Sequence, residues 1–172
     1  IFKYYKTYQN TFSSFTPNEQ QFVSLYGHIS NWNISSITDL SRCFENDVNF
    51  NESLSEWDTR NVRNMSDMFN GCSKFNNNDD MNNMDKPLPW NTDKLQNMAR
   101  MFKNCAKFNQ SLDTWNTTNV TNMSETFSGC EKFNYSLVHW NIGNVTNITN
   151  MFSNNHVLNQ FFANLLDLNL NM

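Results

Sequence analysis

At 172 residues the chain is long enough for one domain with a hydrophobic core and too short for two domains to be expected. Its formal net charge of −4 argues against a nucleic-acid partner, because neutralising phosphates requires a basic surface. No apolar run is long enough to cross a bilayer, so no transmembrane segment is predicted. The 15 Phe and 5 Trp residues supply much of the apolar mass and make a core feasible.

The N-terminal region precedes the repeated part of the chain. Residues 1–15 form a leader whose structure the sequence does not define. Within residues 16–31, Thr16, Pro17 and Glu19 have the pattern of a capping box at a helix start, and Gly27 suits the helix end. We therefore predict an N-terminal cap at 16–31 that contains a helix.

Residues 32–159 repeat with a period of about 25 residues. Tryptophan begins each unit, at Trp32, Trp57, Trp90, Trp115 and Trp140. Phenylalanine follows twelve positions later, at Phe44, Phe69, Phe102, Phe127 and Phe152. Asparagine follows nineteen positions after each Trp, at Asn51, Asn76, Asn109, Asn134 and Asn159. Columns in register predict coils that each have one apolar face, buried by stacking at a rise of about 5 Å per coil.

Each coil is expected to combine helical and extended backbone. Met65, Met68, Phe69 and Cys72 occur at helical spacing and predict a short helical turn with an inward apolar stripe. The segments "NVRNM", "KLQNM" and "NVTNM" read as short strands. The predicted fold class is therefore an α/β repeat, a solenoid of about five 25-residue coils with short strands and a short helical turn in each.

Two segments depart from the regular period. The second coil has eight extra residues, and we place them in an insertion at 77–87 that leaves the solenoid as a loop, because the columns resume in register afterwards. Residues 160–172 lack the tryptophan, so they form either a degenerate last coil or a C-terminal cap.

The repeat resembles a known family. The segments "WDTRNVRNMSDMFNGCSKFN" and "WNTTNVTNMSETFSGCEKFN" are similar to the BspA-like leucine-rich repeat surface proteins, whose repeat also occurs in mycoplasma lipoproteins and in protist and giant-virus proteins. The similarity extends from about Thr16 to Asn159. It implies a leucine-rich-repeat-like solenoid, no catalysis, and a role in adhesion or protein recognition at a surface. The chain departs from the family pattern at Asp47 and Asn155, which replace cysteine, and at the insertion.

The cysteine column admits three interpretations. Cys72, Cys105 and Cys130 are 33 and 25 residues apart, which is the repeat period itself. A disulfide ladder or a metal site is conceivable, but the close cysteine pair that zinc sites usually contain is missing. We predict buried free thiols.

No catalytic constellation is visible. His28, His139 and His156 share no column, and none has a nucleophile and an orienting partner at a useful spacing. We predict that the chain is not an enzyme and has no cofactor and no bound metal.

The asparagine columns have two interpretations. They could bind a ligand such as a glycan, or they could hydrogen-bond backbone turns and one another along the stack. We favour the second, because amides in turns satisfy backbone groups that each coil would otherwise leave unpaired.

Two exposed features are candidate interaction sites. One is the lysine column, Lys74, Lys107 and Lys132. Aligned cations repel one another and suit an acidic partner, and the alternative is a solvated edge. The other is the insertion, with carboxylates at Asp79, Asp80 and Asp85 that could hold a cation, although the ligand alternation and glycine of a calcium loop are missing.

The predicted function is a non-catalytic protein-recognition or adhesion module at a cell or virion surface, with a protein partner. The alternative is a structural subunit of a larger assembly such as a virion or cell envelope. That alternative rests on the asparagine-rich composition and the apolar C-terminal end.

Overall fold

The computed structural model describes residues 27–77 and 88–155. Within these ranges the single helix is the 3-10 helix η1, Ile29–Asn31, and the described residues form no α-helix and no sheet. The side chain of His28 accepts a hydrogen bond from the backbone N–H of Ser30 and caps η1. The predicted leader at 1–15 and the C-terminal coil or cap at 160–172 lie outside the described residues, as does most of the predicted cap at 16–31.

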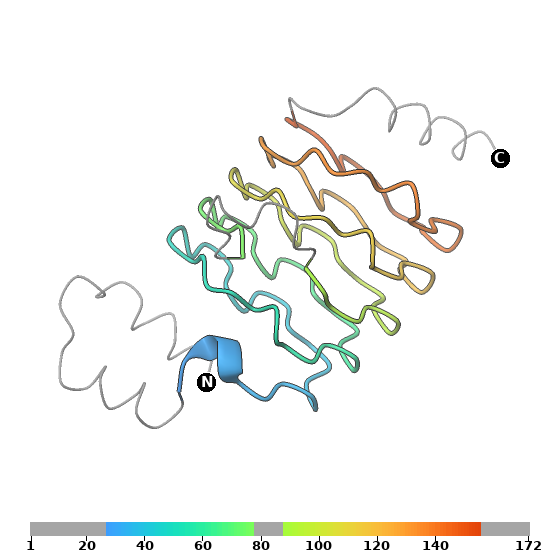
Figure 1. Cartoon of the computed structure of the whole chain (residues 1–172). Helices are drawn as coiled ribbons and strands as arrows, with labels where there is room; N and C mark the ends of the chain where they lie inside the picture. The colour runs from blue at the N-terminus through green and yellow to red at the C-terminus, as the bar shows by residue number, and fades with distance from the viewer. Residues whose placement is uncertain (1–26, 78–87, 156–172) are drawn as a thin grey trace.

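Five coils lie side by side in the described part of the chain (Figure 1). We number them from the tryptophan that begins each one: 32–56, 57–89, 90–114, 115–139 and 140–155. Isolated parallel bridges join equivalent residues of neighbouring coils in one column, Asp39, Asn64, Asn97, Asn122 and Asn147. Each bridge is one residue long, so the column never widens into strands.

The predicted α/β leucine-rich-repeat-like solenoid, with strands and a helical turn in each coil, is therefore wrong. The segments predicted as strands contribute only the single bridges. The segment predicted as a helical turn contains Asp67 with a φ of 58°, which no right-handed helix accommodates. Its backbone hydrogen bonds span three residues, as in Met68 N–H to Met65 C=O, and not the four of an α-helix.

In the first four coils the backbone N–H groups alternate between two kinds of partner. Between the eighth and the fourteenth residue after the tryptophan, every second N–H donates to a carbonyl of the next coil, at 2.7–3.1 Å. In the first coil the donors are Leu40, Arg42, Phe44 and Asn46, and their acceptors are Asn64, Ser66, Met68 and Asn70. The intervening N–H groups close turns inside their own coil, as Cys43 does to Leu40. This division of donors replaces both the helix and the sheet.

Two residues with positive φ make the alternation possible in every coil. They stand ten and fourteen positions after the tryptophan. The fourteenth position holds only asparagine or glycine, the residue types that tolerate this conformation best: Asn46, Gly71, Asn104, Gly129 and Asn154. The tenth position holds Arg42, Asp67, Arg100, Glu125 and Asn150.

Stacked aromatic rings form the core. The first phenylalanine column runs from Phe44 to Phe152 with ring centroids 5.4–5.7 Å apart between coils. A second column runs from Phe50 to Phe133 at 5.7–5.9 Å. Within each of the first four coils the two rings stack at 3.9–4.3 Å. In these coils the phenylalanines are almost completely buried.

Buried polar side-chain atoms are satisfied by backbone carbonyls elsewhere in the stack. The indole N–H of Trp57 donates to the Ile29 carbonyl, just before the first coil, at 2.9 Å. The indoles of Trp90, Trp115 and Trp140 donate in the same way to the carbonyls of Leu54, Leu88 and Leu112. The hydroxyl of buried Thr59 donates in the opposite direction, to the Asn91 carbonyl of the next coil, and Thr92 and Thr117 do the same. Each coil is therefore bonded on both sides.

Truncating a central ring tests the stacked core. We expect Phe102→Ala to lower the free energy of unfolding by about 3–5 kcal/mol, because the ring is buried between Phe69 and Phe127 and its loss leaves a cavity. The exposed Lys107→Ala should change it by no more than about 0.5 kcal/mol. Urea unfolding of both variants is the measurement. A Phe102→Ala protein as stable as the parent would contradict this account of the core.

Substitution of Gly71 tests the left-handed column. A Cβ at Gly71, whose φ is +81°, would lie 2.7 Å from Asn46 Oδ1. We expect Gly71→Ala to destabilise the protein by about 1–3 kcal/mol through this contact and the strained backbone together. Adding Asn46→Gly should recover the part that comes from the contact, measured by urea unfolding with Asn46→Gly alone as the reference. Equal losses with and without Asn46→Gly would show that the oxygen is not in the way.

Candidate interaction surface

The lysine column lies on the surface. Lys74, Lys107 and Lys132 are all exposed, and each is followed directly by a buried phenylalanine of the second column. The centroids of those rings lie 5.9 and 5.8 Å apart from coil to coil, and the lysines occupy equivalent positions on the same three coils. Lys74 Nζ donates to Asn49 Oδ1 at 2.8 Å. Within the described ranges none of the three lysines forms an ion pair.

The asparagine column that follows these phenylalanines is bonded along the stack. Asn51 Oδ1 accepts the backbone N–H of Asn76 at 2.6 Å, and Asn76 Oδ1 accepts that of Asn109 at 2.8 Å. Asn109 Oδ1 accepts the N–H of Asn134 at 3.1 Å. The side-chain oxygens of Asn51, Asn76 and Asn109 are therefore occupied by backbone N–H groups. Asn159 lies outside the described residues.

A separate charged cluster lies in the column of tenth residues. Arg100 binds the carboxylate of Asp67 with two hydrogen bonds, Nε to Oδ1 at 2.7 Å and a second from the guanidinium to Oδ2 at 2.9 Å. Arg42 approaches the same carboxylate at 4.0 Å from the other side. Glu125 of the next coil pairs with Lys103. The charge sign therefore alternates along the column as Arg42, Asp67, Arg100 and Glu125.

The pKa of Arg100 is raised above its ordinary value, chiefly by the hydrogen bond to Asp67. Because the Asp67 side chain is only 4% exposed, water screens this pair less than it screens an exposed ion pair. The cluster therefore binds neighbouring coils together, and its charges are already matched inside the protein.

The cysteine column is buried and chemically unreactive. Cys72, Cys105 and Cys130 are free thiols without exposed surface, and each S–H donates to the carbonyl of a phenylalanine in the preceding coil at 2.9–3.0 Å. Burial raises the pKa of the Cys105 and Cys130 thiols well above the ordinary value. A thiol that stays protonated and inaccessible is a poor nucleophile.

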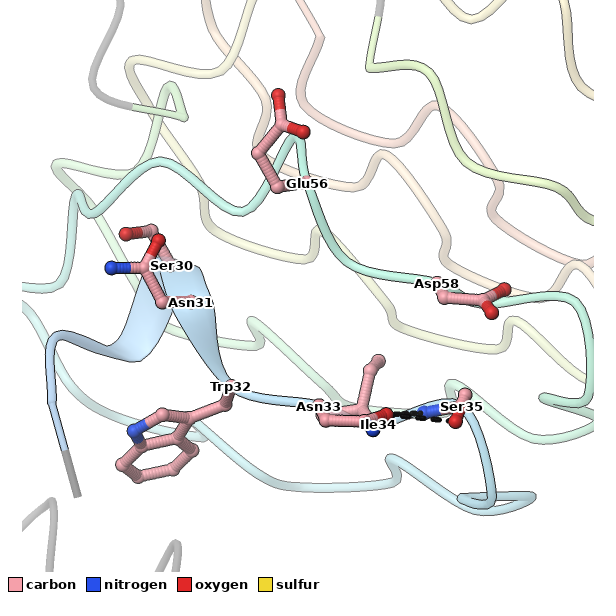
Figure 2. A pocket seen from close by; sticks show the side chains of 8 residues that line it. All are labelled: Ser30, Asn31, Trp32, Asn33, Ile34, Ser35, Glu56 and Asp58. Carbon is pink, nitrogen blue, oxygen red and sulfur yellow. Dashed lines mark hydrogen bonds between the residues drawn. The ribbon is translucent and has the colours of Figure 1, made fainter.

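An open hollow of about 410 Å³ lies between the first two coils, beside η1. The hollow is lined by the segment from Ser30 to Ser35, by Glu56 at the end of the first coil and by Asp58 at the start of the second (Figure 2). The Asn33 side chain is hydrogen-bonded to Ser35. The pKa of Asp58 is lowered, mainly by a hydrogen bond from the Arg60 side chain. The hollow is open to solvent and acidic.

Other predicted site residues fall outside the described part of the chain. Asp79, Asp80 and Asp85 of the insertion belong to this group, so the cation hypothesis stays a prediction. Of the residues that the structure covers, no group of three or more His, Cys, Asp or Glu side chains is arranged to hold a metal ion. No helix in those ranges is long and apolar enough to span a membrane.

Comparison with known proteins gives one match. A family model described as "Mycoplasma protein of unknown function, DUF285" matches residues 7–112 and again 79–169. The chain belongs to this family. The two overlapping matches are what an internal repeat produces, and membership of DUF285 is compatible with a mycoplasma-type repeat surface protein. No curated protein and no solved structure matches the chain.

Sequence reasoning missed two features of this DUF285 chain. One is the left-handed column, for which the signal was present: every coil has Asn or Gly fourteen positions after its tryptophan. The other is the alternating charge cluster around Asp67. Its signal was the change of sign from one coil to the next at the tenth position.

Neutralising Asp67 tests the contribution of the charge cluster. We expect Asp67→Asn, which keeps the shape and tolerates the positive φ, to destabilise the protein by about 1.5–3 kcal/mol, because Arg100 loses a charged acceptor. Asp58→Asn is the matched control and should have a smaller effect, since the Asp58–Arg60 pair is exposed and water screens it. Urea unfolding compares the two. Equal effects would mean that burial adds nothing to the Asp67–Arg100 pair.

Proposed function

We propose that the chain is a non-catalytic protein-recognition or adhesion module that acts at a cell or virion surface. The observation that carries the proposal is the stacking of five coils, which places equivalent residues of successive coils in columns. A partner that touches one member of a column meets the same chemistry again in the next coil. Repeated weak contacts of this kind favour binding to extended partners.

Two further observations support the proposal. The stack is bonded coil to coil by the backbone and by stacked rings, so a partner finds its surface side chains already in position. The chain is also a DUF285 member, and its repeat resembles the BspA-like surface proteins, for which adhesion and protein recognition are the implied roles. That finer resemblance is part of the proposal.

Capture from surface-labelled cells tests the proposed function. The immobilised chain is incubated with an extract of cells whose surface proteins carry biotin, and retained biotinylated proteins are detected. We expect retention that an excess of the free chain competes away, since a specific site saturates. A version with residues 78–87 replaced by a short linker shows whether the insertion takes part.

Two results would count against a recognition module. One is the absence of any competed protein with either version. The other is concentration-dependent self-association in light scattering together with no captured partner, which would favour the alternative of a structural subunit.

A further inference from the structure

We propose that the lysine column binds an acidic, extended polypeptide segment that runs along the stack. This inference rests on the proposed recognition function and specifies its partner. The lysine column comprises Lys74, Lys107 and Lys132.

Unpaired positive charge in an acidic protein is the first observation. The chain carries a net charge of −4, yet three exposed lysines follow one another on three successive coils without an ion pair in the described ranges. In the column of tenth residues, by contrast, the charge changes sign from each coil to the next, and Asp67 binds Arg100. Repulsion among three like charges is relieved only by anions from outside the column.

The small residues beside the lysines are the second observation. The residues directly before Lys74 and Lys107 are Ser73 and Ala106, both small and half-buried. Lys107 N–H donates to the Ser73 carbonyl at 3.2 Å, which ties the two coils together at this point. Because these side chains are small, a peptide can approach the lysine column closely.

Complementary donors are the third observation. In the asparagine column beside the buried phenylalanines, the side-chain oxygens of Asn76 and Asn109 accept backbone N–H groups of the next coil. The side-chain N–H groups of Asn76 and Asn109 make no hydrogen bond within residues 27–77 and 88–155. The surface thus offers cations for carboxylates and amide N–H groups for carbonyl oxygens, which is the combination that a peptide backbone with acidic side chains requires.

The spacing suits an extended peptide. In an extended chain every second side chain lies on the same face, about 6.6–6.8 Å apart. The centroids of the phenylalanine rings beside the lysines lie 5.9 and 5.8 Å apart, and the flexible lysine side chains can adjust to the peptide's slightly longer repeat. Duplex nucleic acid fits less well, because it demands a broad basic surface and this column is one residue wide.

The one acidic neighbour of the lysines allows a test in which a substitution should strengthen binding. Among the residues directly before and after the three lysines, only Glu131 carries a negative charge, and it is exposed. Its negative charge repels an acidic partner at the fourth coil. Removing its charge should therefore strengthen binding without disturbing the core.

Fluorescence anisotropy with a labelled oligo-glutamate peptide is the experiment, with oligo-glutamine as the uncharged reference. We expect the parent chain to bind oligo-glutamate and not oligo-glutamine, and added salt to weaken binding. Lys107→Glu should raise Kd by about tenfold or more, since a like charge replaces the central cation. Glu131→Gln should lower Kd.

Arg63→Glu is the matched control, because it makes the same charge change at an exposed residue of another column. It should alter Kd by less than about twofold. Thermal unfolding shows that each variant is folded. The proposal is overturned if oligo-glutamate does not bind, if Arg63→Glu weakens binding as much as Lys107→Glu, or if a uronic-acid polymer binds more tightly with the same dependence on Lys107. Failure here combined with a competed partner in the surface capture would leave the recognition function intact and move its site elsewhere.

Discussion

In each of the first four coils, four alternate backbone N–H groups donate to carbonyl oxygens of the coil that follows. The rest of the described structure depends on this arrangement. A coil can present its donors along the stack axis only if the intervening N–H groups are satisfied within tight turns, and such turns require residues with positive φ at fixed positions. That requirement explains why Asn46, Gly71 and Asn104 occupy one column. It also explains why neither a helix nor a strand forms there, because each would direct its N–H groups differently.

The same arrangement makes a pair of coils the natural unit of the stack. Asn104 Oδ1 lies 2.6 Å from the place a Cβ would take on Gly129, and Asn46 has the same relation to Gly71. A side chain at Gly71 or Gly129 would therefore force the asparagine of the preceding coil to move. The charges at the tenth position alternate with the same period, from Arg42 through Asp67 to Arg100. In the first four coils, steric fit and charge both distinguish odd coils from even coils.

The sequence predicted the buried columns but not the backbone that carries them. Phe69 and Phe102 were expected to point inward, and both lie fully buried. Met65, Met68 and Cys72 are buried as well, but their spacing misled the prediction of a helical turn. Two left-handed residues return the chain to the same face after three or four positions, so the burial pattern of a helix arises without its hydrogen bonds. The periodicity of the apolar residues predicts which side chains face the core, but it does not determine the backbone angle φ.

Part of the candidate interaction surface was likewise predicted from the sequence, and part was not. Lys74, Lys107 and Lys132 were recognised because a column of identical residues is visible in the period itself. The Asp67–Arg100 pair was not, since its members differ and become neighbours only when the register between coils is known. The acidic residues of the insertion lie outside the described structure, so the hypothesis that they bind a cation stays a prediction.

Deleting one coil tests the pairing of coils most directly. Removal of residues 115–139 places the third coil against the fifth, so that Asn104 meets Asn154 where it formerly met Gly129. Urea unfolding of this deletion variant is compared with and without Asn104→Gly, and the same substitution is measured in the full chain. The account predicts that Asn104→Gly stabilises the deletion variant and does not stabilise the full chain, because only the deletion creates the clash. The same change in stability in both backgrounds would contradict it.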